Sequence, residues 1–277
     1  MGRVIAVTNQ KGGVGKTTTS VNLAASLVAT RRRVLLIDID PQGNATMGSG
    51  VNKYQLEVSA CDVLLGECGL ADAVVRAEPA GYTLLPANAD LTAAEVALIN
   101  MPNRERRLRS VLEPVLDDYD YILIDCPPSL NMLTVNALVA SAGVMIPMQC
   151  EYYALEGLSA LLDTVRQIHQ TLNPQLRVEG VLRTMYDPRN KLAIEVSDQL
   201  LSHMGDKVYR TIIPRNIRVA EAPSHGLPVL LYDKSSRGAL SYLALAGEII
   251  RRDAKDTPTR PAESHGPAVT MEMQDGG

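Results

Sequence analysis

Apolar residues occur along the chain in short continuous runs, separated by stretches in which they recur at helical spacing. The continuous runs indicate strands at 4–7, 34–37, 82–85, 121–124, 144–147, 178–182 and 229–231. A strand that is apolar at every position is buried on both faces of its sheet. Strands that alternate with helices form a doubly wound sheet. We therefore expect an α/β fold in which a mostly parallel sheet is flanked by helices on both faces.

Two stretches have apolar positions at clear helical spacing. The first covers 155–168 and is stopped near Asn173 and Pro174, a pair that ends helices. His169 lies next to this stretch, and we interpret it as a packing or surface residue rather than a ligand. The second covers about residues 235–252, with core-like spacing of Leu240, Leu243, Leu245, Ala246, Ile249 and Ile250.

The length of 277 residues is near the upper end for one domain, and we assign residues 1–255 to a single domain. From Asp256 onward the sequence loses its periodicity, has prolines in close order and is acidic. This composition is typical of a disordered tail, which we place at 256–277. The tail contains no basic amphipathic segment, so no interfacial membrane anchor is predicted.

Composition excludes several function classes. Phe and Trp are absent, so the core is expected to be aliphatic, and readout of nucleic-acid bases by aromatic stacking is not favoured. No apolar stretch reaches the roughly 20 residues of a membrane helix, and the N-terminus leads directly into a strand, which favours a cytoplasmic protein. The four cysteines form no CxxC pair, which indicates reduced, mostly buried thiols rather than a zinc site or disulfides.

The net charge of −4 is unevenly distributed along the chain. Residues 1–175 carry 13 Lys and Arg against 18 Asp and Glu, whereas residues 176–255 carry 13 against 9. The late basic excess could form a patch for a polyanion such as DNA, although charge asymmetry alone is more typical of a solvated face. Composition by itself leaves DNA binding open.

The most informative motif follows the first strand, where residues 11–18 read Lys-Gly-Gly-Val-Gly-Lys-Thr-Thr. Glycines let backbone N–H groups turn toward a polyphosphate, and the positive end of the following helix faces the same anion. We expect Lys16 to reach the outer phosphates and Thr17 to bind Mg²⁺; a turn made only for packing is the alternative. The predicted nucleotide-binding residues are Gly12, Gly13, Val14, Gly15, Lys16, Thr17 and Thr18.

The loop departs from the usual P-loop pattern. That pattern asks for a glycine where this chain has Gln10, and the loop carries an additional lysine, Lys11. A second lysine so close to the phosphate-binding loop is poorly placed to assist Lys16 in binding the phosphates of its own site. We interpret Lys11 as a residue that reaches a nucleotide bound by another subunit.

Carboxylates follow two of the predicted strands. Asp125 ends the run at 121–124 and precedes Cys-Pro-Pro-Ser, the position at which a Walker B carboxylate holds Mg²⁺ through water. Asp38 and Asp40 follow the run at 34–37, and strand alternation directs both to the same side. We assign Asp40, nearer the loop, to orient the attacking water. For Asp38 we favour a structural role, as an acceptor for loop N–H groups or the partner of a lysine.

Five segments together resemble one family. They are Lys11-Gly-Gly-Val-Gly-Lys-Thr-Thr, Asp38-Ile-Asp-Pro-Gln-Gly-Asn-Ala-Thr, Asp125-Cys-Pro-Pro-Ser, Gln149-Cys-Glu-Tyr-Tyr-Ala-Leu-Glu-Gly and Ile213-Pro-Arg-Asn-Ile-Arg. Over about residues 2–252 the chain is similar to the chromosomal ParA proteins, often called Soj, which are deviant Walker A P-loop NTPases related to MinD. The resemblance implies a Mg²⁺-dependent ATPase that segregates a chromosome or plasmid.

The resemblance also implies roles for the residues of the site. Lys11 matches the signature lysine that crosses a dimer interface to the partner's phosphates, and Gly12 lies where the two subunits meet, so ATP would be held between them. Thr17 would ligate Mg²⁺, with Asp125 and Asp40 acting on the metal through water. The implied catalytic residues are Lys11, Lys16, Asp40 and Asp125.

Adenine and DNA contacts are implied by the later segments. Met185 and Pro214 lie in segments that flank the base in this family. Arg189 and Arg218 match arginines through which the ATP-bound homodimer binds double-stranded DNA without sequence preference, consistent with guanidinium contacts to phosphates. Further cations that could widen this patch are Lys191, Arg215, Lys234 and Arg237.

The resemblance further implies a partner and a location. A ParB-like centromere-binding protein would stimulate slow intrinsic hydrolysis, dissolve the dimer and release it from the nucleoid. The protein is therefore expected to be cytoplasmic and nucleoid-associated, without membrane binding.

Three alternative functions from other classes of protein remain. A MinD-like positioning ATPase would bind membrane through a C-terminal amphipathic helix, which the core-like last helix and acidic tail disfavour. An electron-transfer protein like the nitrogenase iron protein would need cysteines that bridge a cluster between subunits, whereas Cys126 lies beside Asp125. A scaffold that does not hydrolyse ATP is disfavoured because Asp40 and Asp125 are both present.

Overall fold

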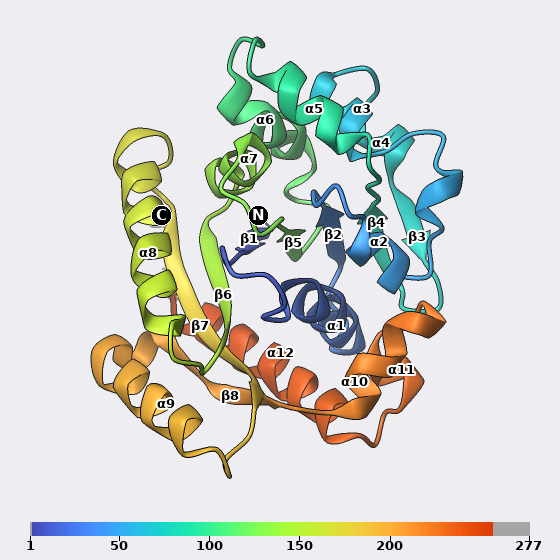
Figure 1. Ribbon diagram of the computed structural model, residues 1–277. Coiled ribbons are helices and arrows are strands. Elements are labelled where there is room, and N and C mark those ends of the chain that lie inside the picture. Colours follow the sequence, from blue (N-terminus) through green and yellow to red (C-terminus); the bar gives the residue numbers. More distant parts are fainter. Residues whose placement is uncertain (1, 257–277) are drawn as a thin grey trace, which may run out of the picture.

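The computed structural model describes residues 2–256. Within them eight strands form one sheet in the order β3-β4-β2-β5-β1-β6-β7-β8 (Figure 1). All neighbours are parallel except β3 and β4. The expected mostly parallel, doubly wound sheet is confirmed. The strands are β1 (Arg3–Val7), β2 (Val34–Asp38), β3 (Val75–Ala77), β4 (Tyr82–Leu85), β5 (Tyr121–Asp125), β6 (Gly143–Gln149), β7 (Arg177–Tyr186) and β8 (Val208–Pro214).

Helices cover both faces of the sheet (Figure 1). One face is covered by α1 (Lys16–Ala29), α2 (Asn44–Gly48), α11 (Val229–Tyr232) and α12 (Arg237–Asp256). The other is covered by α3 (Ala60–Leu65), α4 (Leu70–Ala73), α5 (Leu91–Leu98), α6 (Arg107–Leu112), α7 (Met132–Ala140), α8 (Ala154–Thr171) and α9 (Lys191–Met204). The helix α10 (Ile217–Glu221) follows β8, and single 3₁₀ turns are η1 (Lys53–Gln55), η2 (Arg104–Arg106), η3 (Glu113–Val115), η4 (Gly205–Lys207) and η5 (Ala222–His225).

The central strand β1 explains why continuous apolar runs become strands here. Val4 and Ala6 pack into the core on one face, and Ile5 and Val7 into the core on the other. The chain leaves β1 toward β2 on one side and later places β6 on the other side. The loop after β1 therefore lies at the topological switch point, where open α/β sheets bind ligands.

One predicted strand is wrong. Residues 229–231 lie in the helix α11 instead. The Val229 backbone N–H donates to Asn22 Oδ1 at 2.6 Å, which anchors the segment to α1 rather than to a strand. The runs first identified also omit β3 and β8. Both are edge strands with exposed positions, so neither has the continuous apolar run of a buried strand.

The helix expected at 155–168 is confirmed as α8, which ends before Asn173. In α12, Leu245, Ala246 and Ile249 are fully buried, but Leu240 is 55% exposed, so the predicted core-like spacing is wrong at that position. The four cysteines are free, and all but Cys68 are buried, as predicted. The predicted tail lies outside the described residues apart from Asp256, which ends α12. Across residues 2–256, no helix combines the length and apolar character needed to cross a bilayer.

The edge strand β8 is covered by side chains of α12. The register between β7 and β8 shifts where β8 bulges. Glu248 accepts hydrogen bonds from the backbone N–H groups of Arg210 and Thr211, each at 2.9 Å. Arg252 donates to the Val208 carbonyl at 3.0 Å and to Glu248 at 2.8 Å. These contacts satisfy backbone groups that an exposed edge would otherwise offer to another chain.

Candidate nucleotide-binding site

The glycine-rich loop joins β1 to α1 at the carboxyl edge of the sheet. Gly13 and Gly15 have φ angles of +74° and +88°, in the left-handed region that favours glycine. A Cβ atom at Gly12 or Gly13 would meet nothing within 4 Å, so open space lies before the loop. The Thr184 hydroxyl donates to the Val14 carbonyl at 2.7 Å and ties the loop to β7. The loop thus forms a cradle at the N-terminus of α1, where backbone N–H groups bind anions.

The two loop lysines have different surroundings. Lys16 is buried, and its Nζ donates to the Lys11 carbonyl at 3.3 Å. Burial lowers the pKa of Lys16, while the nearby carboxylates of Asp125 and Asp40 oppose that shift. Lys11 is exposed, and its ammonium forms an ion pair with Glu151, just after β6. Lys16 therefore belongs to the charged centre of its own site, whereas the Lys11 ammonium lies at the surface.

Asp125 ends β5 and is fully buried. Its carboxylate accepts a hydrogen bond from the Thr17 hydroxyl at 2.7 Å and another from the Ser20 hydroxyl at 2.8 Å. Burial and the neighbouring Asp38 raise the pKa of Asp125 to about 8, against the opposing effect of the two hydroxyl bonds. A hydroxyl and a carboxylate joined beside a phosphate cradle are the oxygen donors that suit Mg²⁺. The residues present therefore fit a magnesium–nucleotide complex.

The two aspartates after Ile37 differ in environment. Asp38 is fully buried and accepts hydrogen bonds from the Thr46 N–H and hydroxyl, both at 2.8 Å, and from the Asp40 N–H at 3.1 Å. Burial raises the pKa of Asp38 to about 7 despite these bonds. Its predicted structural role is confirmed. Asp40 lies beyond the end of β2, so strand alternation does not place it, and its carboxylate accepts from the Gln42 N–H at 2.9 Å.

The loop forms one wall of a cleft of about 460 Å³. Its other residues come from the segments that follow β2 and β5, from the ends of β7 and β8, and from α10 and α12. Met185 and Pro214 both line it, and Met185 has a φ of +48°, uncommon for a residue other than glycine. Thr18 and Asp40 also line the cleft, whereas Val14 is buried behind it. A larger hollow of about 1140 Å³, at the opposite ends of β7 and β8, contains no residue of the loop.

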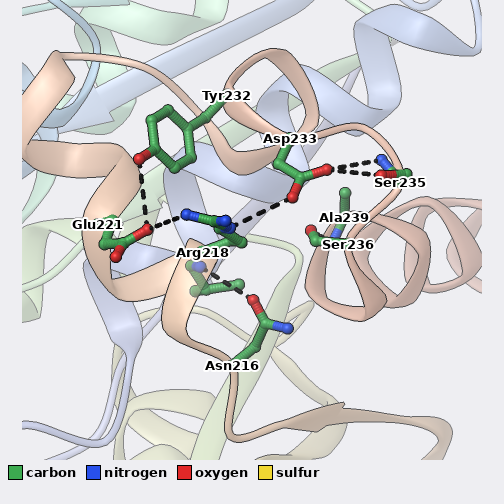
Figure 2. Close-up of polar contacts among 9 residues, drawn as sticks. Asn216, Arg218, Glu221, Tyr232, Asp233, Ser235, Ser236 and Ala239 are labelled. Atoms are coloured by element: carbon green, nitrogen blue, oxygen red, sulfur yellow. Dashed lines mark hydrogen bonds and ion pairs between the residues drawn. The ribbon is translucent and has the colours of Figure 1, made fainter.

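The two arginines expected to contact DNA lie outside the lining of this cleft, and each has carboxylate partners. Arg189, between β7 and α9, donates to both carboxylate oxygens of Asp187, at 2.9 and 2.8 Å. Arg218, on α10, donates to Glu221 at 2.8 Å and lies 3.4 Å from Asp233. Figure 2 shows the Arg218 guanidinium between these two carboxylates.

Sequence reasoning misses three contacts of the site. Ser20 lies one helical turn after Thr17, and that spacing could have suggested a shared carboxylate. Glu151 lies in one of the five family segments and Thr184 precedes Met185, but no local signal indicates that they contact Lys11 and Val14. These pairs form only because β6 and β7 end beside the loop.

Two features of the site define its class. The first strand leads through left-handed glycines into a helix that begins with a lysine, and a nearby strand ends in a buried carboxylate. This is the architecture of P-loop nucleoside triphosphatases. The protein belongs to that class. The sequence profile described as "AAA domain" matches residues 2–178.

Comparison with curated proteins narrows the class to a family. Over 249 residues the chain is 54% identical to the sporulation initiation inhibitor protein Soj of Bacillus subtilis, a match that covers 90% of this chain and 98% of Soj. Over 253 residues it is 51% identical to the chromosome partitioning protein ParA of Caulobacter vibrioides, with 91% and 95% covered. The chain belongs to the ParA/Soj family of ATPases.

A solved structure has the same fold over nearly all of both chains. Cobyrinic acid a,c-diamide synthase from Mycobacterium smegmatis is 38% identical to this chain, with a TM-score of 0.82 and coverage of 93% of this chain and 97% of that one. That protein was crystallised with ADP and magnesium.

Proposed function

We propose that the protein is a Mg²⁺-dependent ATPase that partitions DNA, on a chromosome or a plasmid, through an ATP-bound dimer. The observation that carries the proposal is the hydrogen bond between Thr17 and buried Asp125 beside a loop of left-handed glycines. Membership of the ParA/Soj family supports the cellular role, and the mycobacterial structure with ADP and magnesium supports the ligands.

The loop binds the phosphates of ATP through its backbone N–H groups. Lys16 exchanges its bond to the Lys11 carbonyl for the outer phosphates, and Thr17 turns its hydroxyl from Asp125 to the metal. Asp125 and Asp40 would hold Mg²⁺ through water. Bound Mg²⁺ offsets the charge of the β- and γ-phosphates. Asp40 also orients the attacking water, because it lines the cleft with Lys16.

In this proposal the base of ATP lies in the part of the cleft that Met185 and Pro214 line, and these two residues flank the adenine. Both lie at the ends of strands, so their positions are set by the sheet.

A second subunit completes the site. Lys11 leaves Glu151 and reaches the phosphates in the partner, where its charge stabilises the transferred phosphoryl group. Gly12 supports this arrangement. A side chain at this position would have open space within its own protomer, so the close approach of a second subunit accounts for the glycine. Hydrolysis that depends on a second subunit is slow in the absence of a stimulating partner.

Dimerisation also creates the DNA-binding surface. Arg189 and Arg218 of both subunits contact phosphates, which gives affinity without sequence preference and with a strong dependence on salt. A ParB-like protein stimulates hydrolysis, and the dimer then separates and leaves the nucleoid. Repeated release and rebinding move the cargo of that partner.

The test is binding to a short duplex of arbitrary sequence with ATP, ADP or no nucleotide, at two salt concentrations, with ATP turnover and molar mass measured in parallel. ATP-dependent dimers that bind DNA and lose it at high salt are expected. Binding that is absent, or indifferent to nucleotide, would contradict the proposal.

The same experiment includes anionic lipid vesicles, because a MinD-like ATPase is the alternative. ATP-dependent association with vesicles, without DNA binding, would favour that alternative.

A further inference from the structure

The two proposed DNA-contacting arginines are already occupied. Arg189 gives two hydrogen bonds to Asp187, and Arg218 lies between Glu221 and Asp233. Each guanidinium is nevertheless accessible, with the side chains of Arg189 and Arg218 88% and 52% exposed. A DNA phosphate can therefore reach both arginines, but only in competition with a carboxylate.

The carboxylates around Arg218 are fixed by contacts of their own (Figure 2). Glu221 also accepts a hydrogen bond from the Tyr232 hydroxyl at 3.3 Å. Asp233 accepts from the N–H of Ser235 at 3.1 Å and from its hydroxyl at 2.8 Å, just before α12. Withdrawal of either carboxylate from Arg218 would also break these bonds, which favours a negative charge close to the arginine even after a phosphate displaces the direct contact.

Asp187 is held in a comparable way. Its carboxylate accepts from the backbone N–H of Arg189 at 3.0 Å, in addition to the two guanidinium bonds. Hydrogen bonds from Arg189 lower the pKa of Asp187 to about 2, and Arg215 contributes to the shift. Asp187 therefore stays ionised at every pH at which the protein would be assayed.

A carboxylate that remains beside an arginine changes how strongly the arginine attracts DNA. It cancels the local charge, so the arginine releases fewer counterions from the duplex, and it repels the incoming phosphate. The pair itself is exposed and weak, which lets a phosphate displace the carboxylate rather than being excluded by it. The net effect is a reduced affinity, not a blocked site.

We propose that Asp187, Glu221 and Asp233 are built-in competitors of DNA phosphates, which keep the affinity of a single protomer low. Stable binding then requires the two patches of an ATP-bound dimer, and a separated protomer leaves DNA readily. This inference rests on the proposed function, in which Arg189 and Arg218 contact DNA. Lys191, Arg215, Lys234 and Arg237 have no carboxylate bonded to their side chains among the described residues, and they supply the remaining attraction.

The test neutralises the competitors while keeping their hydrogen-bond acceptors, in Asp187→Asn, Glu221→Gln and the double variant Asp187→Asn/Asp233→Asn. Each single change is expected to tighten binding to duplex DNA by about twofold to fivefold at low salt, and the double change by about tenfold. The double variant should also bind DNA measurably with ADP, whereas the proposed function predicts no such binding by the unmodified protein. If Asp233→Asn destabilises the start of α12, Asp187→Asn/Glu221→Gln replaces it.

The control is the double variant Asp163→Asn/Glu78→Gln, which raises the net charge by the same amount as the double variant Asp187→Asn/Asp233→Asn. Asp163 on α8 lies 2.8 Å from Arg166, and Glu78, just after β3, lies 3.3 Å from Arg76. Both ion pairs are exposed. Affinity that rises no more than in this control, or that falls, would overturn the proposal, because the carboxylates would then be inert or would orient the arginines for DNA.

Two results distinguish a missing competitor role from a missing DNA-partitioning function. If the unmodified protein shows no ATP-dependent DNA binding, the proposed function fails. If that binding is present and is lost on reversing the charge of Arg189 and Arg218, yet the neutralised variants bind no more tightly, only the competitor role fails.

Discussion

Among single residues, Lys16 is the one whose environment most directly indicates phosphate binding. It is buried near Asp125 and Asp40, and its ammonium has a carbonyl partner that a phosphate can replace. We expect Lys16→Ala to weaken ATP binding by about 10-fold to 100-fold, because a charge-assisted hydrogen bond contributes about 1.5–3 kcal/mol. Titration with a fluorescent ATP analogue measures this. The exposed Lys207→Ala is the control, and equal affinities in the two variants would remove Lys16 from the site.

Asp40 should separate hydrolysis from binding. Its carboxylate lines the cleft and makes one backbone contact, to Gln42, so its loss should disturb the fold little. We expect Asp40→Ala to lower the ATP turnover rate by about 100-fold or more while ATP-dependent dimers persist. Turnover and molar mass are measured on the same sample, with the exposed Asp206→Ala as the control. Undiminished turnover would show that another group orients the water.

Among the elements, β8 depends on α12 for its stability. Glu248 is 6% exposed and accepts two backbone N–H groups of the β8 bulge. We expect Glu248→Gln to lower the free energy of unfolding by about 1–3 kcal/mol, because an amide replaces a carboxylate that accepts several bonds. Urea unfolding measures the change. The exposed Glu195→Gln on α9 should change it by less than about 0.5 kcal/mol.

Glu248 also makes the free energy of unfolding depend on pH. Burial alone would raise the pKa of Glu248, but hydrogen bonds from Thr211, Arg210 and Arg252 outweigh burial and lower the pKa below the ordinary 4.5. A carboxylate with a lowered pKa stabilises the fold above that ordinary value and stops doing so as pH falls through the folded pKa. The loss of stability in acid should therefore be shallower in Glu248→Gln, and parallel curves would contradict this contribution.

For the whole molecule, the question is whether nucleotide, dimer and DNA are coupled through separate surfaces. Arg189 and Arg218 lie outside the cleft lining, so Arg189→Glu/Arg218→Glu should abolish DNA binding while ATP-dependent dimers and basal turnover remain. The control Arg76→Glu/Arg166→Glu reverses two other exposed, ion-paired arginines. Binding assays and molar mass at the same ATP concentration test this, and normal DNA binding by the first variant would place the patch elsewhere.

Much of the fold follows from the sequence because the strands are buried on both faces. The continuous apolar runs at β1, β2, β4, β5, β6 and β7 leave little ambiguity. Prediction fails at the margins of the sheet. Residues 229–231 are equally apolar but pack on α1, whereas β8 lies at an edge of the sheet and has partly exposed positions. Short segments at an edge take their structure from their neighbours, which local patterns do not contain.

Sequence alone predicted the chemistry of the site, because the cradle from Gly12 to Thr18 is contiguous and local backbone geometry brings its N–H groups, the lysine ammonium and the threonine hydroxyl together. The tertiary structure decided what these groups contact. Thr17 meets Asp125 across 108 positions, and Lys11 meets Glu151 across 140. Pairs so distant in sequence are brought together only by the strand order. Around the proposed DNA-contacting arginines, Asp187 and Glu221 are near neighbours in the sequence, whereas the fold brings Asp233 to within 3.4 Å of Arg218. Charge competition depends on such separations in space.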